Sequence, residues 1–110
     1  MKFIFSILFL SFLVGQSLDE RYHSVDEIYS LLDSLNQIEE IDDWFHLDTI
    51  GVSTQENIPI LAVRISDNAD IKEDEPRVLF IGQVHAEEIL GVEIIIDLIN
   101  DLLFPDPSIL

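Results

Sequence analysis

An apolar segment that runs directly into a histidine and a glutamate constrains the fold of this chain more than any other feature. Residues 77–84 (RVLFIGQV) are apolar on both faces of an extended chain, which is typical of a strand buried in a parallel sheet. His85 ends this segment, Glu88 follows three residues later, and residues 89–103 have the apolar periodicity of an amphipathic helix. This order predicts an imidazole and a carboxylate at the carboxyl end of a strand, where open α/β sheets bind their ligands.

His85 and Glu88 are suited to metal binding. Histidine and glutamate are common ligands of catalytic zinc, which takes three protein ligands and a water molecule. Because His85 ends the strand and Glu88 lies about one helical turn further on, both side chains can face one point. The pair is predicted to supply two zinc ligands. The spacing alone has little specificity: His23 and Asp26 have the same offset, and we interpret them as a surface pair beside a helix start because no strand precedes them.

The sequence ahead of this unit predicts a helix and a hairpin. A capping-box pattern at Ser24 and Glu27 begins a helix whose apolar face continues to about Gln37. Residues 44–52 and 60–66 have strand patterns and predict an antiparallel hairpin. In the second strand the residues expected to face the core are Leu61, Val63 and Ile65.

The predicted fold class is α/β. We expect the amino-terminal part of a mixed, mostly parallel sheet with helices on both faces, in which the antiparallel hairpin precedes the strand–His-x-x-Glu–helix unit. A strand over residues 78–84 needs neighbours on both edges, and the hairpin cannot provide both. The sheet is therefore expected to be incomplete, and the chain to be a truncated piece of a longer protein.

An ordered set of short motifs extends from Tyr22 to Leu103. These motifs are Tyr22-His23, Glu27-Ile28, Ile50–Ser53, Ala62–Asn68, Glu75-Pro76, Val78-Leu79, His85-Ala86, Glu88 and Val92-Glu93. In order and spacing they resemble the amino-terminal part of zinc metallocarboxypeptidases, especially the bacterial enzymes similar to carboxypeptidases A and T.

The resemblance implies a zinc enzyme that releases carboxyl-terminal residues from a peptide or protein substrate. It makes His85 and Glu88 the first two zinc ligands and places no catalytic residue within this chain. A third ligand (a histidine), a carboxylate-binding arginine, a tyrosine and a general-base glutamate are implied beyond Leu110, so the chain alone is expected to be inactive. The family usually has a substrate-binding arginine where this sequence has Glu87, and a Gly-Arg pair where it has residues 54–57.

Two other functions remain open from the sequence. A zinc deacylase or amidase similar to aspartoacylases would share the His-x-x-Glu ligand pair, although the motifs at Tyr22-His23 and Arg64–Asn68 favour the peptidase. A non-catalytic secreted binding protein is the alternative suggested by Glu87.

The amino terminus predicts export. Residues 1–17 combine Lys2 with an apolar stretch of signal-peptide length, followed by small residues at a cleavage position after Ser17. We therefore expect residues 18–110 to be the mature part, located outside the cell or in the periplasm, with no membrane association after cleavage. Removing residues 1–17 takes away Lys2 and no acid, so the formal net charge changes from −17 to −18. This charge argues against a nucleic-acid partner. The absence of cysteine excludes disulfides and thiolate chemistry.

Several further residues are candidates for a site. The acidic segment 67–75 is a candidate calcium site without EF-hand spacing, and a solvated loop is the preferred interpretation. His46 is interpreted as structural, and Trp44 and Phe45 as core residues. No nucleophile elbow and no glycine-rich phosphate loop occurs. The calcium candidates are Asp67, Asn68, Asp70, Glu73, Asp74 and Glu75.

Overall fold

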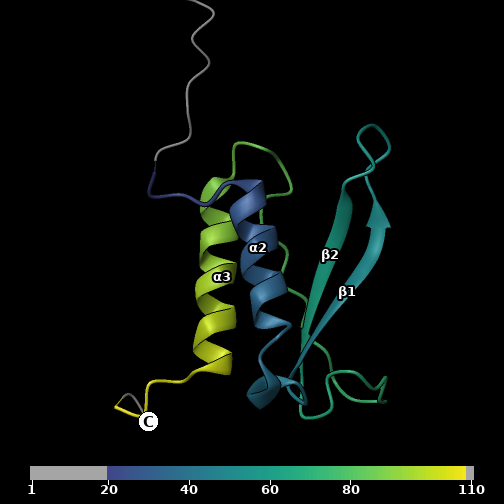
Figure 1. Cartoon of the computed structure of the whole chain (residues 1–110), viewed down its shortest axis with the longest axis vertical. Coiled ribbons are helices and arrows are strands. Elements are labelled where there is room, and N and C mark those ends of the chain that lie inside the picture. Colours follow the sequence, from purple (N-terminus) through teal and green to yellow (C-terminus); the bar gives the residue numbers. More distant parts are fainter. Residues whose placement is uncertain (1–19, 109–110) are drawn as a thin grey trace, which may run out of the picture.

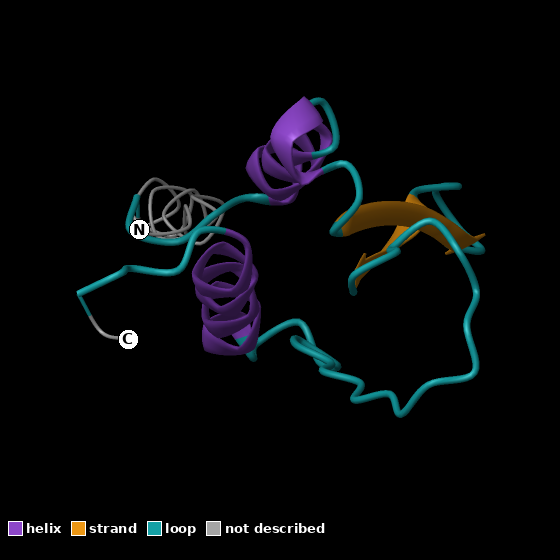
Figure 2. Cartoon of the chain, turned by 90° about the horizontal axis from the view of Figure 1, so that it is seen from below, coloured by secondary structure: helices purple, strands orange, loops and turns teal. Residues whose placement is uncertain are grey.

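The computed structural model describes residues 20–108, in which two helices lie on one side of a two-stranded hairpin (Figures 1 and 2). In chain order the elements are helix α2 (Val25–Leu35), the 3-10 turn η2 (Glu39–Ile41), strands β1 (Phe45–Val52) and β2 (Pro59–Ile65), and helix α3 (Ile89–Leu103). Over this range no helix combines the length and the apolar character that crossing a bilayer requires. The expected signal peptide, residues 1–17, lies outside the described residues.

Helix α2 begins at the predicted capping box. The Ser24 hydroxyl accepts from the backbone N–H of Glu27 at 3.4 Å, and the Glu27 carboxylate accepts from the Ser24 N–H at 2.7 Å. The helix ends at Leu35, two residues earlier than predicted, where the Asn36 N–H still donates to the Leu32 carbonyl at 3.0 Å.

The hairpin is confirmed with strand bounds within one residue of those predicted. Phe45 lies opposite Ile65, and a register shift occurs between Thr49 and Gly51. The turn is closed by Ser53, whose N–H donates to the Ile58 carbonyl at 2.8 Å.

The hydrophobic core joins all the elements. Its buried residues are Leu32, Leu35, Ile41, Phe45, Ile99 and Leu103. Leu61, Val63 and Ile65 pack against this cluster, as predicted for the inner face of β2. The Tyr29 hydroxyl also donates to the Pro59 carbonyl, which ties α2 to the hairpin.

The prediction for Trp44 was wrong: its side chain is 57 % exposed because it precedes β1 and lies outside the cluster.

The predicted strand over residues 78–84 does not form within the described residues. Residues 75–83 have no regular secondary structure, and over residues 20–108 the sheet contains β1 and β2 alone. The physical reason is the lack of a partner, since a strand exists only where its N–H and C=O groups pair with a neighbour. Two strands cannot carry helices on both faces of a mixed sheet, so the predicted architecture is present in part: an α/β arrangement with the hairpin, incomplete.

Candidate metal centre

His85 and Glu88 lie between the apolar segment and α3, and their side chains contact each other. His85 Nδ1 is 3.0 Å from Glu88 Oε1, and the His85 N–H donates to Glu88 Oε2 at 3.2 Å. The Glu88 N–H in turn donates to the His85 carbonyl at 3.0 Å and closes the turn before the helix. The prediction that both side chains face one point is confirmed, and their role as metal ligands stays a prediction.

The electrostatics of the pair favour a cation. The pKa of the Glu88 carboxyl is lowered, chiefly by its hydrogen bond with the His85 side chain and further by the His85 backbone N–H. Glu88 is therefore an anion throughout the neutral pH range. The side chains of His85 and Glu88 are 68 % and 50 % exposed, so an ion can reach both from water.

The pair offers two ligand types that catalytic zinc takes, an imidazole nitrogen and a carboxylate oxygen. His85 Nδ1 and Glu88 Oε1 are in hydrogen-bond contact at 3.0 Å, so a bound ion would replace that contact. No third histidine or carboxylate joins them within residues 20–108, where the one cluster of three possible ligands lies in the loop after β2. If both residues bound a catalytic zinc, they would supply two of the three protein ligands that it requires.

The other two histidines also contact carboxylates, and the contact of His23 joins two helices. His23 Nδ1 lies 2.8 Å from Glu93 Oε2, and the His23 N–H donates to Glu93 Oε1 at 2.8 Å, which links the start of α2 to α3. The interpretation of His23 and Asp26 as a pair was wrong, because α3 packs beside α2 and presents Glu93 to the ring.

His46 belongs to an ion-pair network on the hairpin. Its Nε2 is 3.0 Å from Asp48 Oδ1, while Arg64 Nη2 donates to Asp48 Oδ2 at 2.9 Å. The hydrogen bond from Arg64, followed by that with His46, lowers the pKa of Asp48. An arginine beside this carboxylate repels a metal cation, which agrees with the structural role predicted for His46.

The remaining site candidates are exposed. Glu87 lies next to the ligand pair with its side chain open to solvent. In the acidic segment, ligand atoms of Asp67, Glu73 and Glu75 lie within 4.8 Å of one another, all three exposed. Ser66 Oγ donates to Glu75 at 2.9 Å and to Asp67 at 3.3 Å, so this loop is held by local hydrogen bonds.

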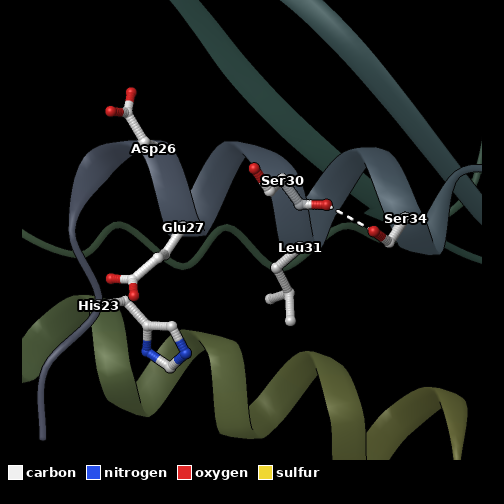
Figure 3. A pocket seen from close by; sticks show the side chains of 6 residues that line it. All are labelled: His23, Asp26, Glu27, Ser30, Leu31 and Ser34. Atoms are coloured by element: carbon white, nitrogen blue, oxygen red, sulfur yellow. Dashed lines mark hydrogen bonds between the residues drawn. The ribbon is translucent and has the colours of Figure 1, made fainter.

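A shallow hollow of about 460 Å³ lies beside the start of α2 (Figure 3). His23, which precedes α2, and Leu31 in α2 point toward α3, whereas Asp26 points away. Ser34 donates to the Ser30 carbonyl at 2.7 Å. A second hollow, of about 220 Å³, lies beside Arg64. His85 and Glu88 line neither of these two hollows, and both side chains are exposed.

The backbone before His85 contains two features that the sequence analysis missed. Gln83 has a φ of 52°, in the left-handed region, and Gly82 packs against Gly91 in the first turn of α3. Residue type does not reveal the backbone angle of Gln83. A glycine within the helical pattern of residues 89–103 was the available signal for the second feature, because glycine there is unfavourable unless another backbone approaches closely.

Comparison with protein families adds the evidence that geometry cannot give. A family model for zinc carboxypeptidases matches residues 28–109, which include His85, Glu88 and every helix and strand of the fold except the first turn of α2. The comparisons with curated proteins and with solved structures found no match. The match extends over most of the 110 residues, and the chain belongs to the zinc carboxypeptidase family.

Proposed function

We propose that the intact protein is an exported, zinc-dependent metallocarboxypeptidase that releases carboxyl-terminal residues from peptides or proteins. The family match over residues 28–109 carries this proposal. The contact between His85 Nδ1 and Glu88 Oε1 supports it, because it shows an imidazole and a carboxylate side by side. Export by residues 1–17 is part of the proposal, and it is tested by whether the mature protein begins at Leu18.

In this proposal each residue of the pair has a distinct role. Glu88 provides a carboxylate that stays charged at neutral pH, and His85 provides a ring nitrogen on the same side of the turn. Bound zinc supplies Lewis-acid chemistry: it polarises a carbonyl and lowers the pKa of a water molecule. The third ligand and the general base come from parts of the intact enzyme beyond these residues.

Glu87 is proposed to contact the substrate. Its exposed carboxylate belongs to the residue that directly precedes Glu88 in the chain. A negative charge there repels the peptide's terminal carboxylate, so this enzyme should bind ordinary peptides less tightly than a relative with a cation at the same position.

The proposal is tested by replacing His85 in the intact protein. His85→Ala should lower zinc affinity and peptide hydrolysis by more than about 100-fold, since loss of a residue that only supports a ligand already costs about 10–100-fold. Zinc content by atomic absorption and release of the carboxyl-terminal residue from peptides are the measurements.

His46→Ala is the matched control, because His46 also lies 3.0 Å from a carboxylate oxygen. It should retain both zinc and activity. Normal zinc content in the His85→Ala protein would contradict the proposed ligand role.

A further inference from the structure

Gln83, two residues before His85, has a backbone conformation that glutamine rarely adopts. Its φ of 52° lies in the left-handed region, which is disfavoured for residues other than glycine, asparagine and aspartate. Asn57, with a φ of 53°, shares this conformation but lies in the hairpin turn, where asparagine is common. A strained residue persists only where its surroundings hold it, and such residues cluster at functional sites.

The Gln83 side chain holds the turn that contains His85. Its Nε2 donates to the Ala86 carbonyl at 3.0 Å, so the amide spans the backbone on both sides of His85. The backbone angle and this hydrogen bond together fix the direction in which the chain passes through His85.

Gly82 and Gly91 hold the same segment against α3. A Cβ atom on Gly82 would lie 2.6 Å from the Gly91 carbonyl oxygen and 2.8 Å from Ile95 Cδ1, closer than real Cβ atoms come. A Cβ on Gly91 would lie 3.1 Å from the Gln83 nitrogen. The φ of Gly82 is not positive, so the requirement for glycine is one of space.

We propose that Gln83 and the Gly82–Gly91 contact are positioning elements that set His85 relative to Glu88 for zinc binding. Glu88 is the N-cap residue of α3 and moves with the helix, whereas His85 belongs to the segment before it. The distance between His85 Nδ1 and Glu88 Oε1 therefore depends on how that segment meets α3. This inference rests on the proposed zinc function.

Zinc affinity of the intact protein, measured by competition with a chromophoric chelator, tests the positioning role. Gly82→Ala forces the segment away from Gly91, and Gln83→Gly permits the same backbone angle without strain but removes the hydrogen bond to Ala86. Each should raise the Kd for zinc by about 10-fold or more, because removal of a residue that orients a metal ligand usually weakens binding by that amount. The visible spectrum of the cobalt-substituted protein should also change, because it reports the ligand geometry.

Two substitutions serve as matched controls. Gly51→Ala places a Cβ at 3.8 Å from Ile60 Cδ1, an ordinary contact, and Asn57→Val strains a left-handed residue far along the chain from His85. Both should keep the wild-type Kd for zinc and cobalt spectrum, even if Asn57→Val lowers Tm.

The outcomes separate this inference from the proposed function. A wild-type Kd and cobalt spectrum in Gln83→Gly would overturn the role of Gln83, and the same result in Gly82→Ala would overturn that of the glycine contact. If Gly82→Ala does not fold, Gln83→Gly alone decides. A wild-type protein that takes up no zinc would overturn the proposed function, and the positioning role with it.

Discussion

Adjacent glutamates have different environments at this site. Hydrogen bonds with the ring and the backbone N–H of His85 lower the pKa of Glu88. The Glu87 side chain, by contrast, faces solvent. One is therefore suited to holding a cation. The other is free to meet a ligand that approaches from solution.

The charge of Glu87 gives a prediction for substrate binding. Glu87→Arg in the intact enzyme should lower KM for ordinary peptides, because a cation replaces an anion near the peptide's carboxylate. About 1.5–3 kcal/mol is at stake for a hydrogen bond to a charged group, or roughly 10- to 100-fold in KM. Glu40→Arg, on the exposed surface of η2, is the matched control and should leave KM unchanged. An equal KM for wild type and Glu87→Arg would show that Glu87 makes no contact with substrate.

The sequence could predict that His85 and Glu88 lie near each other, because only two residues separate them in the chain. It could not predict the conformation of Gln83, which depends on how the segment is held against α3. The same limit explains why His23 was paired with Asp26. Its actual partner, Glu93, is 70 residues away along the chain.

At the scale of elements, the predictions that rest on neighbouring residues are confirmed, whereas the predicted strand that needs distant partners does not form. The capping box at Ser24 and the apolar periodicity of residues 89–103 fix where α2 and α3 begin, and both helices start where predicted. The hairpin strands pair with their own chain neighbours and were also predicted. The strand predicted over residues 78–84 requires partner strands that its own sequence does not specify. Its apolar pattern therefore does not determine whether backbone pairing forms.

The link between α2 and α3 gives a prediction for the pH dependence of stability. Hydrogen bonds from the His23 backbone and side chain, in that order, lower the pKa of Glu93. A lowered folded-state pKa contributes stability above the unfolded pKa, near 4.3 for glutamate, and that contribution is lost as pH falls through the folded value. Glu93→Gln should therefore destabilise the protein at about pH 6 and have much less effect at about pH 3.

Denaturant unfolding of the intact protein at both pH values measures this difference. Glu40→Gln, which removes an exposed carboxylate from η2, should leave the pH dependence of the wild type unchanged. The same loss of stability at both pH values in Glu93→Gln would mean that the link does not depend on the ionised carboxylate.

For the whole molecule, charge and exposed apolar surface act in opposite directions. The formal net charge is −17, which favours solubility. Yet Val78, Leu79, Phe80, Ile81 and Val84 are between 60 % and 80 % exposed, in a segment whose backbone groups pair with no strand among the described residues. Unpaired extended segments of this kind invite pairing with other chains.

We therefore expect residues 18–110, produced alone, to associate or to lack fixed packing despite their negative charge. The apolar segment is short, so one charge within it should reduce association. Leu79→Lys should therefore shift the size-exclusion profile toward monomer. Val52→Lys is the matched control: Val52 is 56 % exposed but lies opposite Pro59 in the hairpin, and its replacement should change the profile little. Hydrogen exchange over residues 78–84 provides the second measurement and should be fast. A sharp monomer peak with slow exchange across these residues would mean that the segment finds its partners within the chain, and that the described fold is more complete than its two strands indicate.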